Sequence, residues 1–192
     1  MPLGANKVAL LGASADTGTS ILLATGIASS SASLEFTIPA TYKQIVFGFY
    51  NIAPATDNVH FGFQGTTDGT NYNLYMTTTA FEAYNNEVGG SPDVNYQTAI
   101  DQAQGQIFQP ILPYMGNDAD QSGAGALHLF NPSSTTYVKH FFHRGQVYNA
   151  TNYAQDDYMA GYFNTTSAIT AIKFQMASGN IGAGTIKMWG VL

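Results

Sequence analysis

The chain has no cysteine and very little charge, since only 9% of its 192 residues are Asp, Glu, Lys or Arg. A typical soluble domain has about a quarter of its residues charged. The lack of cysteine excludes disulfides, thiolate metal sites and cysteine nucleophiles. The shortage of ionisable groups leaves little from which an acid–base active site could be assembled. We therefore expect a non-enzymatic protein without catalytic residues, resident metal or cofactor.

Positive charge is scarcest, with six Lys and Arg residues against twelve Asp and Glu, and a formal net charge of −6. Binding of nucleic acid or of an anionic membrane requires clustered cations, and the sequence has no such cluster. The apolar run at residues 8–11 is shorter than the roughly 7–15 residues of a signal-peptide core. No apolar run approaches the ~18–20 residues of a membrane span. We expect no nucleic-acid partner, no signal peptide and no membrane insertion.

Aromatic residues are abundant at 13%, and the chain is 45% hydrophobic, which is enough for a sizeable core in one domain. Apolar residues alternate with polar ones at Leu34, Phe36 and Ile38, which is typical of a strand with one buried face. Residues 44–52 are apolar on both faces and predict a central strand. The same reasoning predicts strands at 59–64, 106–109, 126–130, 137–144, 159–164, 168–176 and 185–191.

The turn at residues 66–71 contains Asp68 and Gly69, a pair that favours positive φ. Apolar alternation resumes at Tyr72, so we predict a hairpin across this turn. Residues 85–105 carry the weakest strand signal: 85–93 is expected to be a loop, and 96–104 a short helix or an irregular strand. Many short strands without a convincing helix predict an all-β antiparallel sandwich, with a jelly roll as the preferred form.

Residues 1–32 differ from the rest, because they are rich in Gly, Ala, Ser and Thr and contain no aromatic residue. Such a segment cannot form much core alone. We therefore divide the chain into an extended N-terminal arm, 1–32, that docks on another protein, and a β-sandwich domain, 33–192.

Tyrosine and asparagine gather near the predicted loops. Exposed aromatic rings with amide donors can bind sugars or form protein interfaces, although ordinary core and rim packing in an aromatic-rich sandwich is the favoured explanation. The candidate binding residues are Tyr84, Asn85, Asn86, Tyr148, Asn152 and Tyr153.

The sequence gives weaker support for a metal site or a catalytic site. His140 and His143 are three residues apart, so on one strand they face opposite sides and cannot share an ion. Residues 117–121 carry oxygen ligands at alternate positions but lack the glycine and distal glutamate of a calcium loop, so a solvated turn is expected. The acidic residues include only three Glu, and no spacing singles out the carboxylate pair that glycoside cleavage requires.

Several segments resemble uncharacterised virion-associated proteins of tailed bacteriophages, marine ones in particular. The resemblance covers roughly residues 33–192 and is most specific in the closing segment. The segments that carry it are 34–39 (LEFTIP), 54–58 (PATDN), 127–139 (LHLFNPSSTTYVK) and 178–190 (SGNIGAGTIKMWG).

The resemblance implies a virion protein and implies no catalytic residue. An assembly held together by many copies needs little charge, which fits this composition. We therefore expect a structural protein on the virion surface, a capsid decoration anchored by its arm to a major capsid or tail protein. Self-association is expected, with a trimer as the first guess. The alternative is a tail-fibre or receptor-binding adhesin that contacts host glycan, and a depolymerase is the weaker third candidate.

Overall fold

The computed structural model describes residues 20–90 and 92–192. Every regular element in these residues is a β-strand, and the strands form two antiparallel sheets. The described residues contain no helix that is long and apolar enough to cross a bilayer. The predicted all-β antiparallel sandwich is thus confirmed. The signal-peptide prediction and residues 1–19 of the predicted arm lie outside the described residues.

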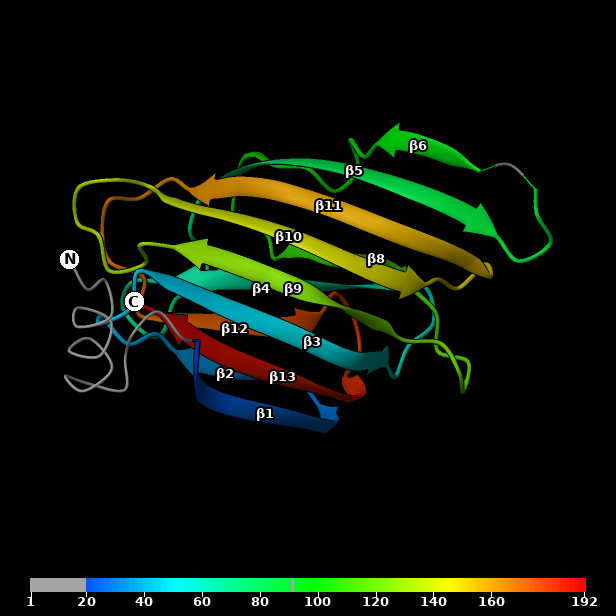
Figure 1. Ribbon diagram of the computed structural model, residues 1–192, viewed down its shortest axis with the longest axis horizontal. Coiled ribbons are helices and arrows are strands. Elements are labelled where there is room, and N and C mark those ends of the chain that lie inside the picture. Colours follow the sequence, from blue (N-terminus) through cyan, green and yellow to red (C-terminus); the bar gives the residue numbers. More distant parts are fainter. Residues whose placement is uncertain (1–19, 91) are drawn as a thin grey trace, which may run out of the picture.

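The larger sheet has nine strands, and its smaller partner, which lies behind it in Figure 1, has four. The larger sheet runs in spatial order through β1 (Ile21–Ser31), β13 (Ile181–Val191), β3 (Gln44–Pro54), β9 (Gly123–Phe130), β10 (Lys139–Tyr148), β11 (Tyr153–Phe163), β5 (Met76–Asn86) and β6 (Asp93–Tyr96), with β7 (Ala103–Gly105) also paired to β5. The smaller sheet is β2 (Leu34–Thr37), β12 (Ala171–Met176), β4 (Val59–Thr66) and β8 (Gln109–Met115).

The core lies between the sheets and is centred on Phe174 of β12, which is fully buried. Its ring centroid lies 5.0 Å from that of Phe47 and 5.3 Å from that of Phe49, both on β3 of the larger sheet. Phe61 stacks against the same ring at 5.8 Å. The edge-to-face pairs with Phe47 and Phe49 join the two sheets across the sandwich, whereas the stacked pair lies within the smaller sheet.

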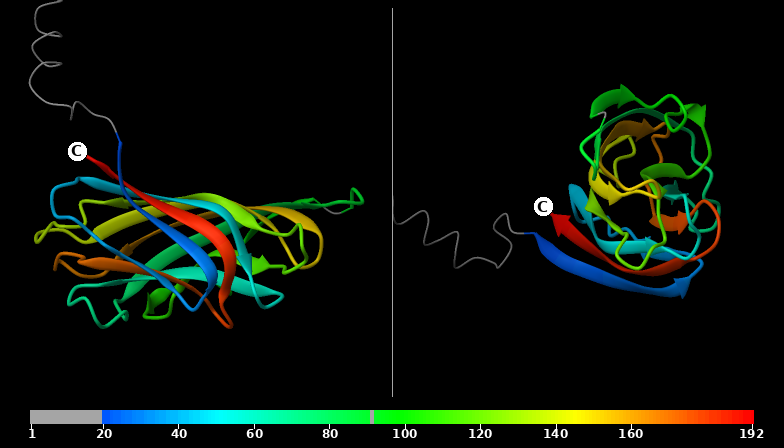
Figure 2. Two further views of the ribbon diagram at one scale, coloured as in Figure 1. Left: turned by 90° about the horizontal axis from the view of Figure 1, so that it is seen from below. Right: turned by 90° about the vertical axis from the view of Figure 1, so that its right-hand side faces the viewer.

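The predicted arm ends earlier than expected. Residues 21–31 form β1, which pairs antiparallel with β13 along its length, and Figure 2 shows the two strands side by side. Ala28 of β1 is buried in the core. Small residues were a poor guide here because a strand paired on one side needs few bulky side chains of its own.

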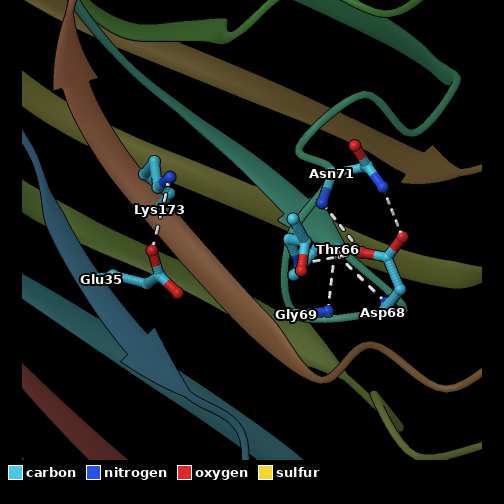
Figure 3. Close-up of polar contacts among 7 residues, drawn as sticks. Glu35, Thr66, Asp68, Gly69, Asn71 and Lys173 are labelled. Atoms are coloured by element: carbon cyan, nitrogen blue, oxygen red, sulfur yellow. Dashed lines mark hydrogen bonds and ion pairs between the residues drawn. The ribbon is translucent and has the colours of Figure 1, made fainter.

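The predicted hairpin at residues 66–71 is wrong, although the turn itself forms. The Asp68 carboxylate accepts hydrogen bonds from the Thr66 hydroxyl and from the backbone N–H groups of Thr70 and Asn71, each at 2.8 Å, and Gly69 has φ 77° (Figure 3). These bonds hold the pKa of Asp68 well below its usual range. However, β4 pairs with β12 and β8, and β5 lies in the other sheet, so the turn connects the two sheets.

Two other strand predictions need correction. The strand predicted at 106–109 is instead β8, which contains Pro110 and Pro113. Proline is tolerated there because β8 is an edge strand with irregular pairing to β4. The segment 96–104, expected as a helix or irregular strand, holds the end of β6 and the start of β7. The long strand β5 was missed, since its run of threonines lacks an apolar alternation.

Candidate functional site

A pocket of about 420 Å³ lies where the larger sheet extends beyond β8, the edge of the smaller sheet. The extension consists of β11, β5 and β6, and Tyr114 of β8 forms part of the opposite wall. The described residues that line it are Asn58, Glu82, Tyr84, Asn95, Tyr114, Asn149, Ala150, Thr151, Tyr153 and Gln155.

Three tyrosines supply aromatic surface to this pocket. Tyr84 of β5 and Tyr153 of β11 meet edge to face, with ring centroids 5.5 Å apart. The Tyr84 hydroxyl accepts a hydrogen bond from Asn95 Nδ2 at 3.2 Å, which ties β5 to β6. Tyr114 has φ 56°, an unusual value for a bulky residue, and its backbone N–H donates to His60 Nδ1 at 3.1 Å. Contacts between β5, β6 and β11 thus hold the rings of Tyr84 and Tyr153, and the His60 ring lies 4.8 Å from the Tyr114 ring.

The turn between β10 and β11 forms the rim and is organised by Asn149. The Asn149 Oδ1 atom accepts hydrogen bonds from the backbone N–H groups of Thr151 at 2.9 Å and Tyr153 at 3.1 Å. Its Nδ2 group donates to Gln155 Oε1 at 3.1 Å, and Gln155 Nε2 donates to Asp157 Oδ1 at 2.8 Å. A continuous chain of hydrogen bonds therefore links the rim to a buried carboxyl group.

Two buried carboxyl groups are neighbours here, of which Glu82 lines the pocket and Asp157 does not. Glu82 of β5 and Asp157 of β11 are direct partners across the antiparallel pair, with side chains on the same face. They are 7% and 4% exposed. Glu82 Oε1 accepts a hydrogen bond from Gln97 Nε2 at 2.5 Å, whereas Glu82 Oε2 and Asp157 Oδ2 have no partner within the described part of the protein.

Burial disfavours the ionised form of both groups. It raises the pKa of Asp157 to about 8, and the hydrogen bond from Gln155 opposes this effect while the nearby charge of Glu82 adds to it. Burial also raises the pKa of Glu82. Asp157 therefore holds its proton at neutral pH. Titratable groups with such shifts gather at functional sites, although structural clusters also produce them.

Two of the six residues proposed from the sequence, Tyr84 and Tyr153, line this pocket together. The other four lie elsewhere. Asn85 is exposed, Asn86 Oδ1 accepts a hydrogen bond from the Gly90 N–H at 2.7 Å, and the Tyr148 hydroxyl donates to Glu87 at 2.8 Å. Asn152 Oδ1 accepts from Gln121 Nε2 at 3.2 Å. Sequence reasoning missed Glu82 and Asp157, because no spacing in the chain marks residues that become neighbours only across a strand pair.

The metal candidates are not brought together. His143 is buried while His140 is exposed on the other face of β10, as their spacing predicts. In the turn at 117–121, Gln121 Oε1 accepts from the Asp118 N–H at 3.1 Å, and the Asn117 N–H donates to Asp57 at 3.2 Å. Residues 20–90 and 92–192 contain no group of three His, Cys, Asp or Glu side chains placed to hold an ion.

Comparisons with models of protein families, with curated proteins and with solved structures found no match to this chain.

Proposed function

We propose that this protein is a non-enzymatic structural component of the surface of a tailed-phage virion, where it decorates the head as a homo-oligomer. Its N-terminal residues would attach it to a major capsid or tail protein. The resemblance of four segments to virion-associated proteins suggests the location. The observation that carries self-association is the character of the edge strand β1.

Strand β1 is an unusual edge. It is 11 residues long, and its sequence ILLATGIASSS has neither a charged residue nor a proline. Soluble proteins blunt their exposed edges with charge, proline or very short strands, because an unpaired edge recruits other chains. Ile27 is 72% exposed and Leu22 is 52% exposed on this strand. A second copy that pairs with β1 would cover both side chains.

The outer face of the larger sheet continues this apolar surface. Leu22 is the register partner of Trp189, and Trp189 that of Val46. The row goes on through His128 to Phe142, whose rings stack at 4.5 Å. Phe142 is 44% exposed. An apolar row across several strands adds contact area beside the edge, as an interface between subunits requires.

The strand orders also support the finer prediction of a jelly roll. The orders β1-β13-β3-β9 and β2-β12-β4-β8 are those expected for the two sheets of a jelly roll, with consecutive strands β1 to β4 alternating between them. Strands β5, β6, β7, β10 and β11 then become insertions that widen one sheet. Jelly rolls serve in viral capsids and in lectins, which fits the proposal by analogy of fold.

The oligomeric state tests self-association. We expect the wild-type chain to be an oligomer by light scattering, and Ile27→Lys to dissociate it by placing charge on the edge. Thr70→Lys, in the exposed turn after β4, is the matched control and should leave the oligomer intact. A monomeric wild-type chain at micromolar concentration would contradict the proposal.

A reconstruction of the intact particle tests the location. Density for this chain is expected on the head surface, in contact with the major capsid protein. Density confined to the tip of a tail fibre would favour the adhesin, and virions that keep their structure without this chain would rule out a structural role.

The pocket favours a second candidate function, a tail-fibre or receptor-binding adhesin that contacts host glycan. Its tyrosine rings and amide groups are suited to sugar faces and hydroxyl groups. We expect the purified chain to bind host cells, and Tyr153→Ala and Tyr84→Ala to abolish binding. Phe81→Ala, which removes an exposed ring of β5 that lies outside the pocket lining, is the control.

The two buried carboxyl groups make an assay for polysaccharide cleavage necessary. Retaining glycosidases use carboxyl groups about 5–5.5 Å apart, and direct cross-strand partners have Cβ atoms at about that separation. The non-enzymatic proposal predicts that the chain releases no reducing ends from host polysaccharide. Release that disappears in Glu82→Gln would overturn it.

A further inference from the structure

We propose that the pocket between β5, β8 and β11 binds a ligand that carries a protonated amino group on a hydroxylated frame, with amino sugars as the class that fits. The inference deepens the adhesin candidate and rests on ligand binding at this pocket. It is independent of whether β1 forms a subunit interface.

The first argument is the pair of unpartnered acceptors. Glu82 Oε2 and Asp157 Oδ2 are both buried without a hydrogen-bond donor in the described part of the protein, although Glu82 lines the pocket. An unsatisfied buried acceptor is costly and rare in native structures. An ammonium group offers three donors. One such group, seated in the pocket, can donate to Glu82 Oε2, and its charge then lies beside the neighbouring Asp157 carboxyl group.

The second argument is charge. The described residues that line the pocket include Glu82 but no Lys, Arg or His. The cation nearest in register, Arg144, is on the outer face of the sheet and pairs with Asp156 at 2.8 Å. A ligand with a negative charge would meet Glu82, with Asp157 as its neighbour across the strand pair, and no compensating cation. The pocket therefore discriminates against acidic sugars and phosphorylated ligands.

The third argument is the aromatic lining. Tyr84, Tyr114 and Tyr153 present three rings to a volume of about 420 Å³, which is in the range of small-ligand pockets. A cation is attracted to the face of an aromatic ring, and the attraction increases when water is excluded. The polar lining groups of Asn58, Asn95 and Thr151 can hydrogen-bond to hydroxyl groups of the same ligand.

A metal ion or a neutral sugar explains these observations less well. A divalent ion prefers six or more oxygen ligands, and the described residues place no third acidic or histidine side chain beside the pair. A neutral hydroxyl group could satisfy one acceptor but would not offset the cost of ionising two neighbouring buried acids. An ammonium group does both, so its binding should release a proton from the pair.

The groups around the pair determine whether proton release on binding can be assigned to Glu82 and Asp157. Tyr114 faces the pair from β8, and burial raises its pKa, with a further contribution from the charges of Glu82 and Asp157. The register neighbours on the far sides are the uncharged Asn95 of β6 and Gly145 of β10. His143 of β10, on the same buried face as Gly145, stays neutral because burial lowers its pKa to about 3. Asp156 belongs to the opposite face. At pH 7, proton release on binding therefore reports the Glu82–Asp157 pair once the fraction of ligand amine that is already neutral at that pH has been subtracted.

The experiment compares three sugars that share one frame and differ in charge: glucosamine, glucose and glucuronate. Isothermal titration of the full chain at pH 7, in two buffers of different ionisation enthalpy, gives affinity and proton release together. We expect glucosamine to bind at least tenfold more tightly than glucose, with proton release, and glucuronate to bind more weakly than glucose. Asp157→Asn and Glu82→Gln should each remove the preference for glucosamine.

Asp156→Asn is the matched control, since it makes the same chemical change one residue away on the other face of β11, and it should bind like the wild type. Equal binding of glucose and glucosamine would overturn the amine preference while leaving glycan binding intact. If no sugar binds at millimolar concentration but cells still bind, the pocket proposal is wrong and the adhesin candidate stands. Calcium binding that Asp157→Asn abolishes, without an effect of glucosamine, would replace the amine with a metal ion.

Discussion

Substitution of Asp157 by asparagine should make the protein more stable at high pH and leave it unchanged at low pH. Asparagine keeps the size of the side chain and its Oδ1 acceptor, so the hydrogen bond from Gln155 Nε2 can remain. The substitution removes only the ability to ionise. Because burial raises the pKa of Asp157 to about 8 in the folded protein, the folded state binds a proton that the unfolded state releases near pH 4.

This difference sets the sign and the window of the effect. Between about pH 4 and 8 the folded state binds more protons at Asp157 than the unfolded state, so the free energy of unfolding falls as pH rises. Above pH 8 this contribution is constant. At 1.36 kcal/mol per pKa unit, a rise from 3.8 to about 8 corresponds to a limit of about 6 kcal/mol. Relaxation beside an open pocket reduces this limit, so we expect a gain of about 2 kcal/mol or more.

Urea denaturation at fixed protein concentration, followed by the fluorescence of Trp189, measures the effect at pH 4.5, 6, 7.5 and 9. Trp189 is the only tryptophan of the chain and lies on β13, far along the sheet from β11. The stability of Asp157→Asn relative to the wild type should rise across this series. A difference that stays within 0.5 kcal/mol at every pH would refute the claim that Asp157 is neutral in the folded protein. Asp156→Asn should give no such rise.

Three other substitutions test the packing by the same denaturation assay. Phe174→Ala should destabilise the protein by about 3–5 kcal/mol, because the ring is fully buried between the sheets, and a loss below 1 kcal/mol would contradict its central place. Gly62→Ala should lower the free energy of unfolding by more than about 1 kcal/mol, because the added Cβ would lie 2.8 Å from the backbone oxygen of Gln109. An unchanged stability would show that β8 moves away freely. Gln109→Leu should lower the free energy of unfolding by about 2–4 kcal/mol. It removes the amide that donates to the Ile100 carbonyl at 2.8 Å and the oxygen that accepts from the Thr78 hydroxyl at 2.8 Å. An unchanged stability would mean that water replaces both hydrogen bonds.

The strands with clear alternation were predicted well. The pattern at Leu34 and Phe36 and the apolar run at 44–52 became β2 and β3, because a strand with a buried face imposes a two-residue period on its own sequence. The strands β1 and β8 were missed or misplaced for reasons of context. At an edge, small residues and prolines are acceptable, and only the position of the strand in the sheet reveals that it is an edge.

The turn at Asp68 shows the same limit. Its local chemistry is encoded by Thr66, Asp68 and Gly69, and the turn forms as expected. Whether the chain then returns to the same sheet depends on which partners compete for β4. Both sides of β4 are occupied, by β12 and β8, so the chain continues into the larger sheet.

The sequence by itself determined that this is a β-sheet protein with an aromatic core and an ion-poor surface, since alternation and composition are local properties of a chain. Only the tertiary structure decided that Glu82 shares a pocket with Tyr84, Tyr114 and Tyr153, and that the buried Asp157 is its cross-strand partner. The physical reason is register. Side chains from distant strands become neighbours only when backbone pairing sets β5 against β11, and the burial that changes their acidity exists only after the sheets have closed.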